Sequence, residues 1–251
     1  LLSDGKRLIL CNTLDSLDSL QGSHKRLRSG YSGPMLEDRI IFIDAEAIIL
    51  DKPAGLPVDT PRRGGDSIAS RLDELRCGFQ RPPTPMHRLD TDTSGCLLFA
   101  RSPRARAAFQ QAFEGRAVEK YYLAVVGGEI AEESGVIDTP LAKTSSAEAG
   151  WKMVTDPHGL EATKHWGRIA VRAGATLGEV LPRTGRTHQI RAHARAAFGT
   201  GIVGDRVYGI PGGLMLLHAS RLVVPREGKP AIDVTAPLPD HFADWRPFDK
   251  L

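Results

Sequence analysis

The stretch Met86–Gly95 is dense in side chains that can do chemistry: His87, Arg88, Asp90 and several hydroxyls. It precedes a short apolar run, residues 96–100, and a loop that leads directly into a buried strand can hold a catalytic group rigidly. Asp90 could therefore act as a nucleophile, although an aspartate between Leu and Thr also suits an ordinary loop or capping position. His87 taken alone favours a structural role.

A second cluster, in the later part of the chain, is basic. If Ile190 faces the core of a helix, then His188, Arg191 and Arg195 share a neighbouring face at spacings of three and four. The turn 183–186 before them combines two arginines with a helix N-terminus, which can bind an anion such as phosphate. A solvated basic face with surface ion pairs has the same spacing, so spacing alone leaves both interpretations open.

The elements that position these two clusters can be predicted from the hydrophobic pattern of the chain, which indicates more strands than helices. Ser102 followed by Pro103 marks a helix start and Gly115 its end, while residues 129–160 carry little signal. Prolines 237, 239 and 247 indicate a tail lying over the surface. Irregularly inserted helices favour an α+β fold. We expect strands at 40–42, 48–50, 118–126, 162–172, 176–181 and 214–224, helices at 66–76, 103–114 and 187–198, and a helical core stripe of Ile190, Ala194, Ala197 and Phe198.

Composition narrows the class of protein. The chain has 251 residues, of which 41% are hydrophobic, enough to bury one sizeable core. No apolar run approaches the roughly 18 residues of a membrane span, and the first residues lack a signal-peptide layout. Three cysteines without metal-ligand spacing indicate a reducing, cytoplasmic compartment and no metal site. Glycine pairs at 64–65 and 212–213 lack a phosphate-loop context, so we expect no nucleotide cofactor.

Ordered sequence blocks resemble the RluA-type pseudouridine synthases. His87–Gly95 fits the family pattern H-R-L-D-x-x-T-S-G, and the resemblance extends over roughly residues 39 to 240. The last glycine of one block, the K-x-Y-x-A-x-V-x-G strand, falls one place early here. The further blocks are Lys52–Val58 (K-P-x-G-x-x-V), Glu119–Gly127 (the K-x-Y strand), Pro182–His193 (T-G-R-T-H-Q-I-R-x-H), Gly204–Gly209 and Leu217–Ala219.

The resemblance implies a central mixed, mostly antiparallel β-sheet flanked by helices and loops, with the active site in a cleft across it. It implies isomerisation of uridine in RNA to pseudouridine without a cofactor. The catalytic aspartate of the family corresponds to Asp90, its active-site tyrosine to Tyr122, and the basic partner of the aspartate to Arg191. Ile190 would line the uracil pocket, and Tyr121 would point to the opposite face of its strand.

These roles are chemically consistent. Breaking and remaking a glycosidic bond needs a carboxylate held close, and an arginine partner would keep it ionised and oriented. Attack on the base, attack on the sugar and removal of a sugar proton are all compatible with one carboxylate. A stacked uridine cannot reach such a group, so the target must be flipped out. We expect Arg88 to hold the gap or the flipped base, His188 to contact substrate, and Arg186 and Arg195 to bind phosphates.

Many relatives carry an N-terminal RNA-binding module, but residues 1–34 are too short and irregular for one. We expect a flexible tail at 1–34, either native or upstream of a natural start at Met35, and a catalytic domain at 35–251. RNA selection would then use loops such as 62–63 and 101–106. We expect a monomer that acts on ribosomal or transfer RNA. The alternatives are a non-catalytic RNA-binding protein with this fold, and an aspartate-dependent hydrolase, which would need a second carboxylate and a water-activating base.

Overall fold

The computed structural model describes residues 34–146 and 150–248, so the predicted tail lies outside the described residues except for Pro34. Strands dominate, with helices inserted irregularly between them. The strands are β1 Ile40–Ile43, β2 Ala47–Lys52, β3 Thr84–Pro85, β4 Ser94–Ala100, β5 Glu119–Gly127, β6 Ser134–Asp138, β7 Leu141–Ser146, β8 Gly150–Thr155, β9 Thr163–Arg172, β10 Ala175–Pro182, β11 Leu217–Arg226 and β12 Lys229–Thr235. The helices are α1 Pro103–Glu114, α2 Gln189–Phe198 and the 3-10 helices η1 Glu37–Arg39, η2 Ala69–Leu75 and η3 Asp240–Phe248.

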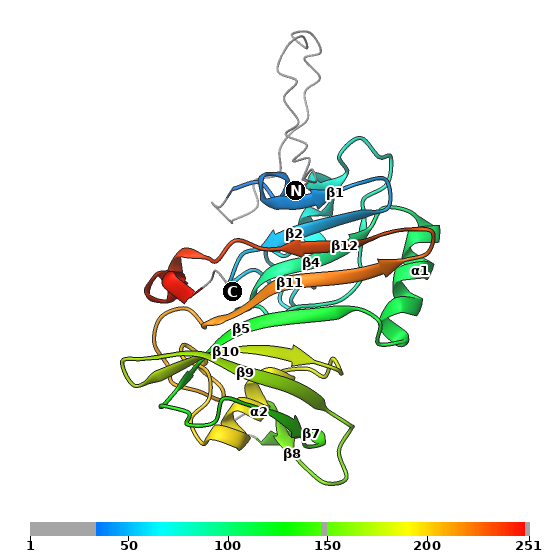
Figure 1. Ribbon diagram of the computed structural model, residues 1–251. Helices are drawn as coiled ribbons and strands as arrows, with labels where there is room; N and C mark the ends of the chain where they lie inside the picture. The colour runs from blue at the N-terminus through cyan, green and yellow to red at the C-terminus, as the bar shows by residue number, and fades with distance from the viewer. Residues whose placement is uncertain (1–33, 147–149, 249–251) are drawn as a thin grey trace, which may run out of the picture.

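Ten strands form one mixed sheet across the described residues, in the order β1-β2-β4-β11-β5-β10-β9-β6, with β12 added to β11 and β3 to β4. Every pairing is antiparallel except β4 with β11. The β7–β8 hairpin is a separate two-stranded sheet. Figure 1 shows α1 near the β4–β11 region and α2 with the β7–β8 hairpin beyond β9. The predicted α+β class with a mostly antiparallel sheet is confirmed.

The two central strands β2 and β4 are buried along their whole length. Side chains alternate between the two faces of a strand, so a continuous apolar run fills both. Ile49 and Leu98 pack on the face covered by α1. Ile48 and Leu97 pack on the other face, against η2 and Leu89 of the loop before β4.

The helix predictions hold in position and differ in detail. Ser102 caps α1 by accepting the amide of Ala105. The helix expected at 66–76 is the 3-10 helix η2. Helix α2 begins at Gln189 rather than residue 187, because His188 adopts a left-handed backbone conformation. Ala197 was wrongly assigned to the core stripe: it is exposed, since the buried side of α2 is concentrated in its first turns.

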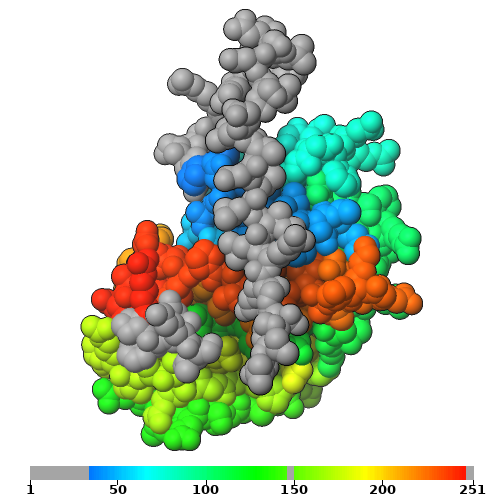
Figure 2. Space-filling view, turned by 45° about the horizontal axis from the view of Figure 1, so that its top comes forward, coloured from blue at the N-terminus to red at the C-terminus, as the bar shows by residue number. Residues whose placement is uncertain are grey.

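The segments with little sequence signal are where strands were missed. Residues 129–160 contain β6, β7 and β8, which lie at an edge or in a hairpin and show mostly exposed or half-buried residues. Strand β12, which pairs with β11, was also missed. The predicted tail marked by Pro237, Pro239 and Pro247 follows β12 and is mostly exposed or half-buried through residue 246, and its helix η3 inserts Phe242 and Trp245 into a core cluster. Figure 2 shows these orange-to-red segments lying between the blue N-terminal strands and the yellow-green part of the chain.

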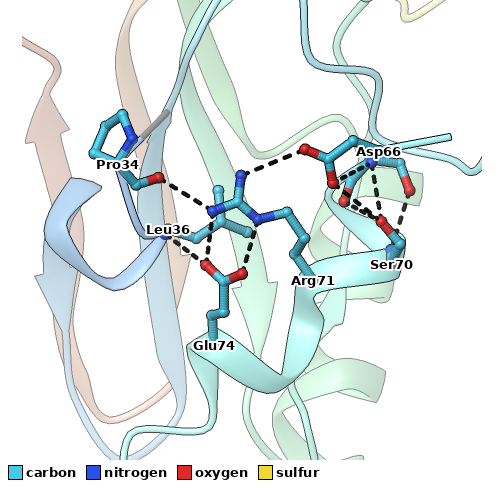
Figure 3. A network of polar contacts seen from close by, with 7 residues as sticks. Pro34, Leu36, Asp66, Ser70, Arg71 and Glu74 are labelled. Atoms are coloured by element: carbon cyan, nitrogen blue, oxygen red, sulfur yellow. Dashed lines mark hydrogen bonds and ion pairs between the residues drawn. The ribbon is translucent and has the colours of Figure 1, made fainter. Parts of the chain in front are cut away.

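A polar network ties η2 to the first described residues. The carboxylate of Glu74 accepts hydrogen bonds from the amide of Leu36 and from Arg71, and Arg71 also reaches the carbonyl of Pro34 and the carboxylate of Asp66 (Figure 3). Because Leu75 of η2 shares a core cluster with Leu89, this network also stabilises the loop at residues 86–93. No helix among the described residues is long and apolar enough to cross a membrane.

Candidate active site

The loop that carries Asp90 is fixed from beneath by Lys52. The Lys52 ammonium is fully buried and donates to the carbonyls of Pro53, Leu56 and Thr91 at 2.9, 2.7 and 3.0 Å. Burial lowers the pKa of Lys52 to about 7, against the attraction of Asp92 and Asp90. Three carbonyl acceptors match the three donors of an ammonium, so this lysine acts as a clamp between β2 and the loop.

The backbone requires a glycine at position 95, the last residue of the H-R-L-D-x-x-T-S-G pattern. Its φ is +104°, and a Cβ here would lie 2.2 Å from the carbonyl oxygen of Ala219. Only glycine allows β4 and β11 to approach this closely. Beside it, Ser94 and His218 are joined by a buried 2.9 Å hydrogen bond. The parallel pairing is therefore locked at the point where the catalytic loop enters the sheet.

Arg191 of α2 lies between two carboxylates. Its Nη1 donates to Asp90 Oδ2 at 3.0 Å, while Nε and Nη2 donate to the two oxygens of Asp205 at 2.7 and 2.8 Å. Asp205 is fully buried and also accepts the amides of Val207 and Tyr208. Burial opposes the charge, but the hydrogen bonds and attraction of Asp205, together with Asp90, hold the pKa of Arg191 above its ordinary value. Asp205 therefore fixes the guanidinium so that one edge faces Asp90.

A cavity of about 290 Å³ opens in front of Asp90, at the lower end of the roughly 300–1,000 Å³ typical of small-ligand sites. Tyr122 of β5 and Ile190 of α2 line it together with Asp90. Tyr121 lies outside it and bonds to Glu119, as strand alternation predicts. Burial, with the charge of Asp90, raises the pKa of Tyr122, so its phenol stays protonated. The cavity combines the Asp90 carboxylate with aromatic and apolar side chains, a lining that suits a flat polar base.

His188 lies at the mouth of the cavity in a left-handed conformation, which is strained for a residue other than glycine. The Tyr208 hydroxyl accepts the amide of Met153 and shares a 3.0 Å hydrogen bond with His188 Nδ1. The other ring nitrogen, Nε2, lies 3.9 Å from Asp90 Oδ2. Burial lowers the pKa of His188. The ring lines the cavity, and half-exposed Trp151 stacks on it at 4.8 Å.

The predicted RNA-contacting arginines differ in position. Arg88 lines the cavity mouth and pairs with Asp59 at 3.2 Å, both side chains being exposed. Arg186 lines the cavity and donates to the Glu161 carbonyl. Arg195 does not share the site with Arg191, because it turns back to the carbonyls ending α2. Of the loop 101–106, Arg101 is engaged by the carbonyls of residues 44 and 77 and stacks on a phenylalanine.

His87 is part of the scaffold. Its Nε2 accepts the amide of Leu98, and its ring packs against Phe113. Burial and the charge of Lys120 lower the pKa of His87 to about 3, so it stays neutral. Within residues 34–146 and 150–248, no group of three His, Cys, Asp or Glu side chains could hold a metal ion.

Several residues of the site were not assigned a role from the sequence. Asp205 and Tyr208 lie in the Gly204–Gly209 block, and Lys52 begins the Lys52–Val58 block, so the block matches were the available signal. Trp151 lies in the segment with little periodicity, and no sequence signal pointed to it.

Comparison with known proteins agrees with this geometry. The RNA pseudouridylate synthase family profile matches residues 46–196. An uncharacterised RNA pseudouridine synthase of Zymomonas mobilis is 46% identical over 215 residues, covering 84% of this chain and 98% of that protein. The dual-specificity RNA pseudouridine synthase RluA of Vibrio vulnificus is 37% identical, covering 67% of this chain and 68% of its own length. In fold, the chain is similar to human RNA pseudouridylate synthase domain containing 4, with a TM-score of 0.70 and 24% identity over 83% of this chain and 91% of that one. The chain therefore belongs to the RluA-type family of RNA pseudouridine synthases.

Proposed function

We propose that this synthase isomerises specific uridines of structured ribosomal or transfer RNA, with Asp90 as the catalytic carboxylate. The observation that carries the proposal is the Asp90 carboxylate held at 3.0 Å by Arg191 in a cavity lined by Tyr122 and Ile190. A named relative with dual specificity and another named as acting on the large ribosomal subunit support this range of substrates.

In the proposed reaction, the target uridine is flipped out of its stack, and its base lies against the ring of Tyr122 and the side chain of Ile190. The bond between N1 and the ribose C1′ breaks, the base turns, and a bond forms between C5 and C1′. The hydrogen leaves C5 as a proton, and N1 gains one, so the product is an isomer of the substrate. Asp90 is the group that acts on the uridine while these bonds break and form. Arg191 holds the Asp90 carboxylate in place.

Arg88, Arg186 and His188 line this cavity, and His188 Nε2 lies 3.9 Å from Asp90 Oδ2. In the proposal, the two arginines contact the RNA backbone around the flipped nucleotide, and His188 donates to substrate. Arg195 lines a separate depression with Lys152 and serves an outer RNA contact.

The hydrolase alternative finds no support in the surroundings of Asp90. A hydrolase needs a second carboxylate to activate water, but Asp205 is fully buried and all its oxygens are occupied by Arg191 and two amides. A protein that only binds RNA would gain nothing from a carboxylate at this position, because the negative charge of Asp90 would repel the RNA phosphates.

Tritium release tests the proposal. Ribosomal RNA transcripts and a pool of transfer RNA transcripts, labelled at C5 of uridine, are incubated with the protein. We expect tritium release without free uracil, and complete loss of release in the Asp90→Asn variant, which still binds RNA. Release of uracil would indicate hydrolysis, whereas binding without tritium release from either RNA class would refute the assigned reaction. Mapping pseudouridine in cells with and without the protein then identifies the target.

A further inference from the structure

The candidate site contains one cation that the proposed mechanism does not use, Lys120. It lies on β5 two residues before Tyr122, so both side chains project from the same face of the strand. The side chain lines the cavity in front of Asp90 and also the adjoining depression along Arg183. It is therefore located where the two hollows meet.

Lys120 has no hydrogen bond or ion pair with any residue in the described ranges 34–146 and 150–248. Burial lowers its pKa, and no carboxylate lies near enough to offset this. A partly buried ammonium without an anion is unfavourable, because such charges are normally paired or hydrogen-bonded. The free protein thus holds a cation that lacks its counter-ion.

The other cations around the cavity each have a partner within the protein. Arg191 has two carboxylates, Lys52 has three carbonyls, Arg186 has the carbonyl of Glu161, and Arg88 has Asp59. The neighbouring His87 is neutral and accepts a backbone amide, so it cannot neutralise Lys120. Among the described residues, Lys120 is the cation lining the cavity that has no partner in the protein.

The space in front of the Lys120 ammonium is kept open by Gly185. A Cβ added to Gly185 would meet only the Lys120 Nζ, at 3.8 Å, and its φ is not in the left-handed region. Backbone geometry therefore does not require glycine here. A side chain at 185 would instead occupy the approach to Lys120.

We propose that Lys120 binds a backbone phosphate directly attached to the flipped uridine, and that the RNA strand leaves the cavity between β5 and the turn at Gly185. Uracil and ribose carry no charge, so phosphate is the anion that RNA can bring to this position. The inference deepens the proposed function and rests on it, because it assumes that a nucleotide occupies the cavity.

Mononucleotide binding tests the inference without knowledge of the target RNA. Uridine, uridine 3′-monophosphate and uridine 5′-monophosphate are titrated into the full chain and followed by NMR. We expect one of the monophosphates to bind about tenfold more tightly than uridine, as one charge-assisted hydrogen bond allows. In Lys120→Met this advantage falls below about twofold while uridine affinity is unchanged. Lys120→Arg keeps part of it.

The charge-matched control is Lys229→Met, which removes a lysine at the start of β12 that pairs with Glu46 and does not line the cavity. It leaves the phosphate advantage intact. Lys120→Met should also melt at a temperature equal to or above that of the wild type, because it removes an unpaired buried charge. A merely structural lysine would instead lower the melting temperature without changing the ratio of monophosphate to uridine affinity.

The two proposals fail in different ways. If neither monophosphate binds better than uridine to the wild type, or if the advantage survives in Lys120→Met, the phosphate site is refuted even when tritium release succeeds. If tritium release fails but the phosphate advantage depends on Lys120, the nucleotide site stands and the assigned reaction falls.

Discussion

Asp90 and Asp205 both pair with Arg191, but replacing each of them by asparagine should have different effects. Asp205→Asn replaces a fully buried oxygen that pairs with the guanidinium by an amide N–H group. Asp90→Asn changes a side chain that is 20% exposed, makes one hydrogen bond to the guanidinium, and can still accept it through its amide oxygen. We therefore expect Asp205→Asn to damage stability and Asp90→Asn to damage catalysis.

The magnitudes follow from burial. Removing one partner of a buried ion pair costs about 3–5 kcal/mol. At about 2–4 °C per kcal/mol for a domain of this size, Asp205→Asn should lower the melting temperature by roughly 6–20 °C. Asp90→Asn leaves Arg191 paired with Asp205 and should change stability by no more than about 1 kcal/mol. Its tritium release should fall by at least about 10⁴-fold, as expected for loss of a reacting group.

Thermal unfolding and tritium release, both measured on each variant, form the assay. Asp233→Asn is the matched control, because Asp233 makes the same two-oxygen contact with Arg221 at 2.7 and 2.6 Å but on the surface. This variant should lose less than about 1 kcal/mol and keep full activity. If Asp90→Asn lowered the melting temperature more than Asp205→Asn, the assignment of one carboxylate to chemistry and the other to positioning would be refuted.

Three further predictions concern neighbouring parts of the site. Tyr122→Phe should slow turnover far more than Tyr121→Phe, because only residue 122 faces the cavity; equal losses would contradict this strand register. Gly95→Ala should unfold or severely destabilise the protein by calorimetry, since the added Cβ meets a backbone carbonyl at 2.2 Å; a melting temperature near that of wild type would show that β4 and β11 can separate. Burial lowers the pKa of His218 to about 4 and that of His87 to about 3, whereas the unfolded chain binds these protons near 6.5. Stability from His218 is thus complete above pH 6.5 and falls on the order of 3 kcal/mol by pH 4; a flat free energy of unfolding over this range would contradict it, and His218→Gln should lessen the slope.

Sequence periodicity was sufficient to predict those strands and helices that bury a continuous face. The apolar runs of β2 and β4 and the cap and stripe of α1 could be identified directly. It was insufficient for β6 to β8, whose residues are largely exposed, and for η3, whose two buried aromatic residues stand among prolines and charges.

The site depended on a different kind of information. Asp90 and Arg191 are 101 positions apart, and no local pattern joins them, so their pairing followed only from the family resemblance. The spacing rule on α2 grouped Arg195 with Arg191, but helix spacing does not say that a side chain near a C-terminus prefers its own carbonyls. Asp205 was not assigned a role from the sequence, because its role is apparent only when the contacts of the Arg191 guanidinium with both carboxylates are known.

The parallel contact between β4 and β11 has a consequence for folding during translation. Ser94 and His218 are 124 positions apart, so at a synthesis rate of about 5–20 residues per second, β4 waits roughly 6–25 s for this partner. During that interval the central strand of the future sheet has an open edge beside the loop of the catalytic aspartate. No nascent chain ending before β11 can contain a finished active site. The period of exposure to mispairing therefore runs from the synthesis of β4 to that of β11, while β5 to β10 are being made.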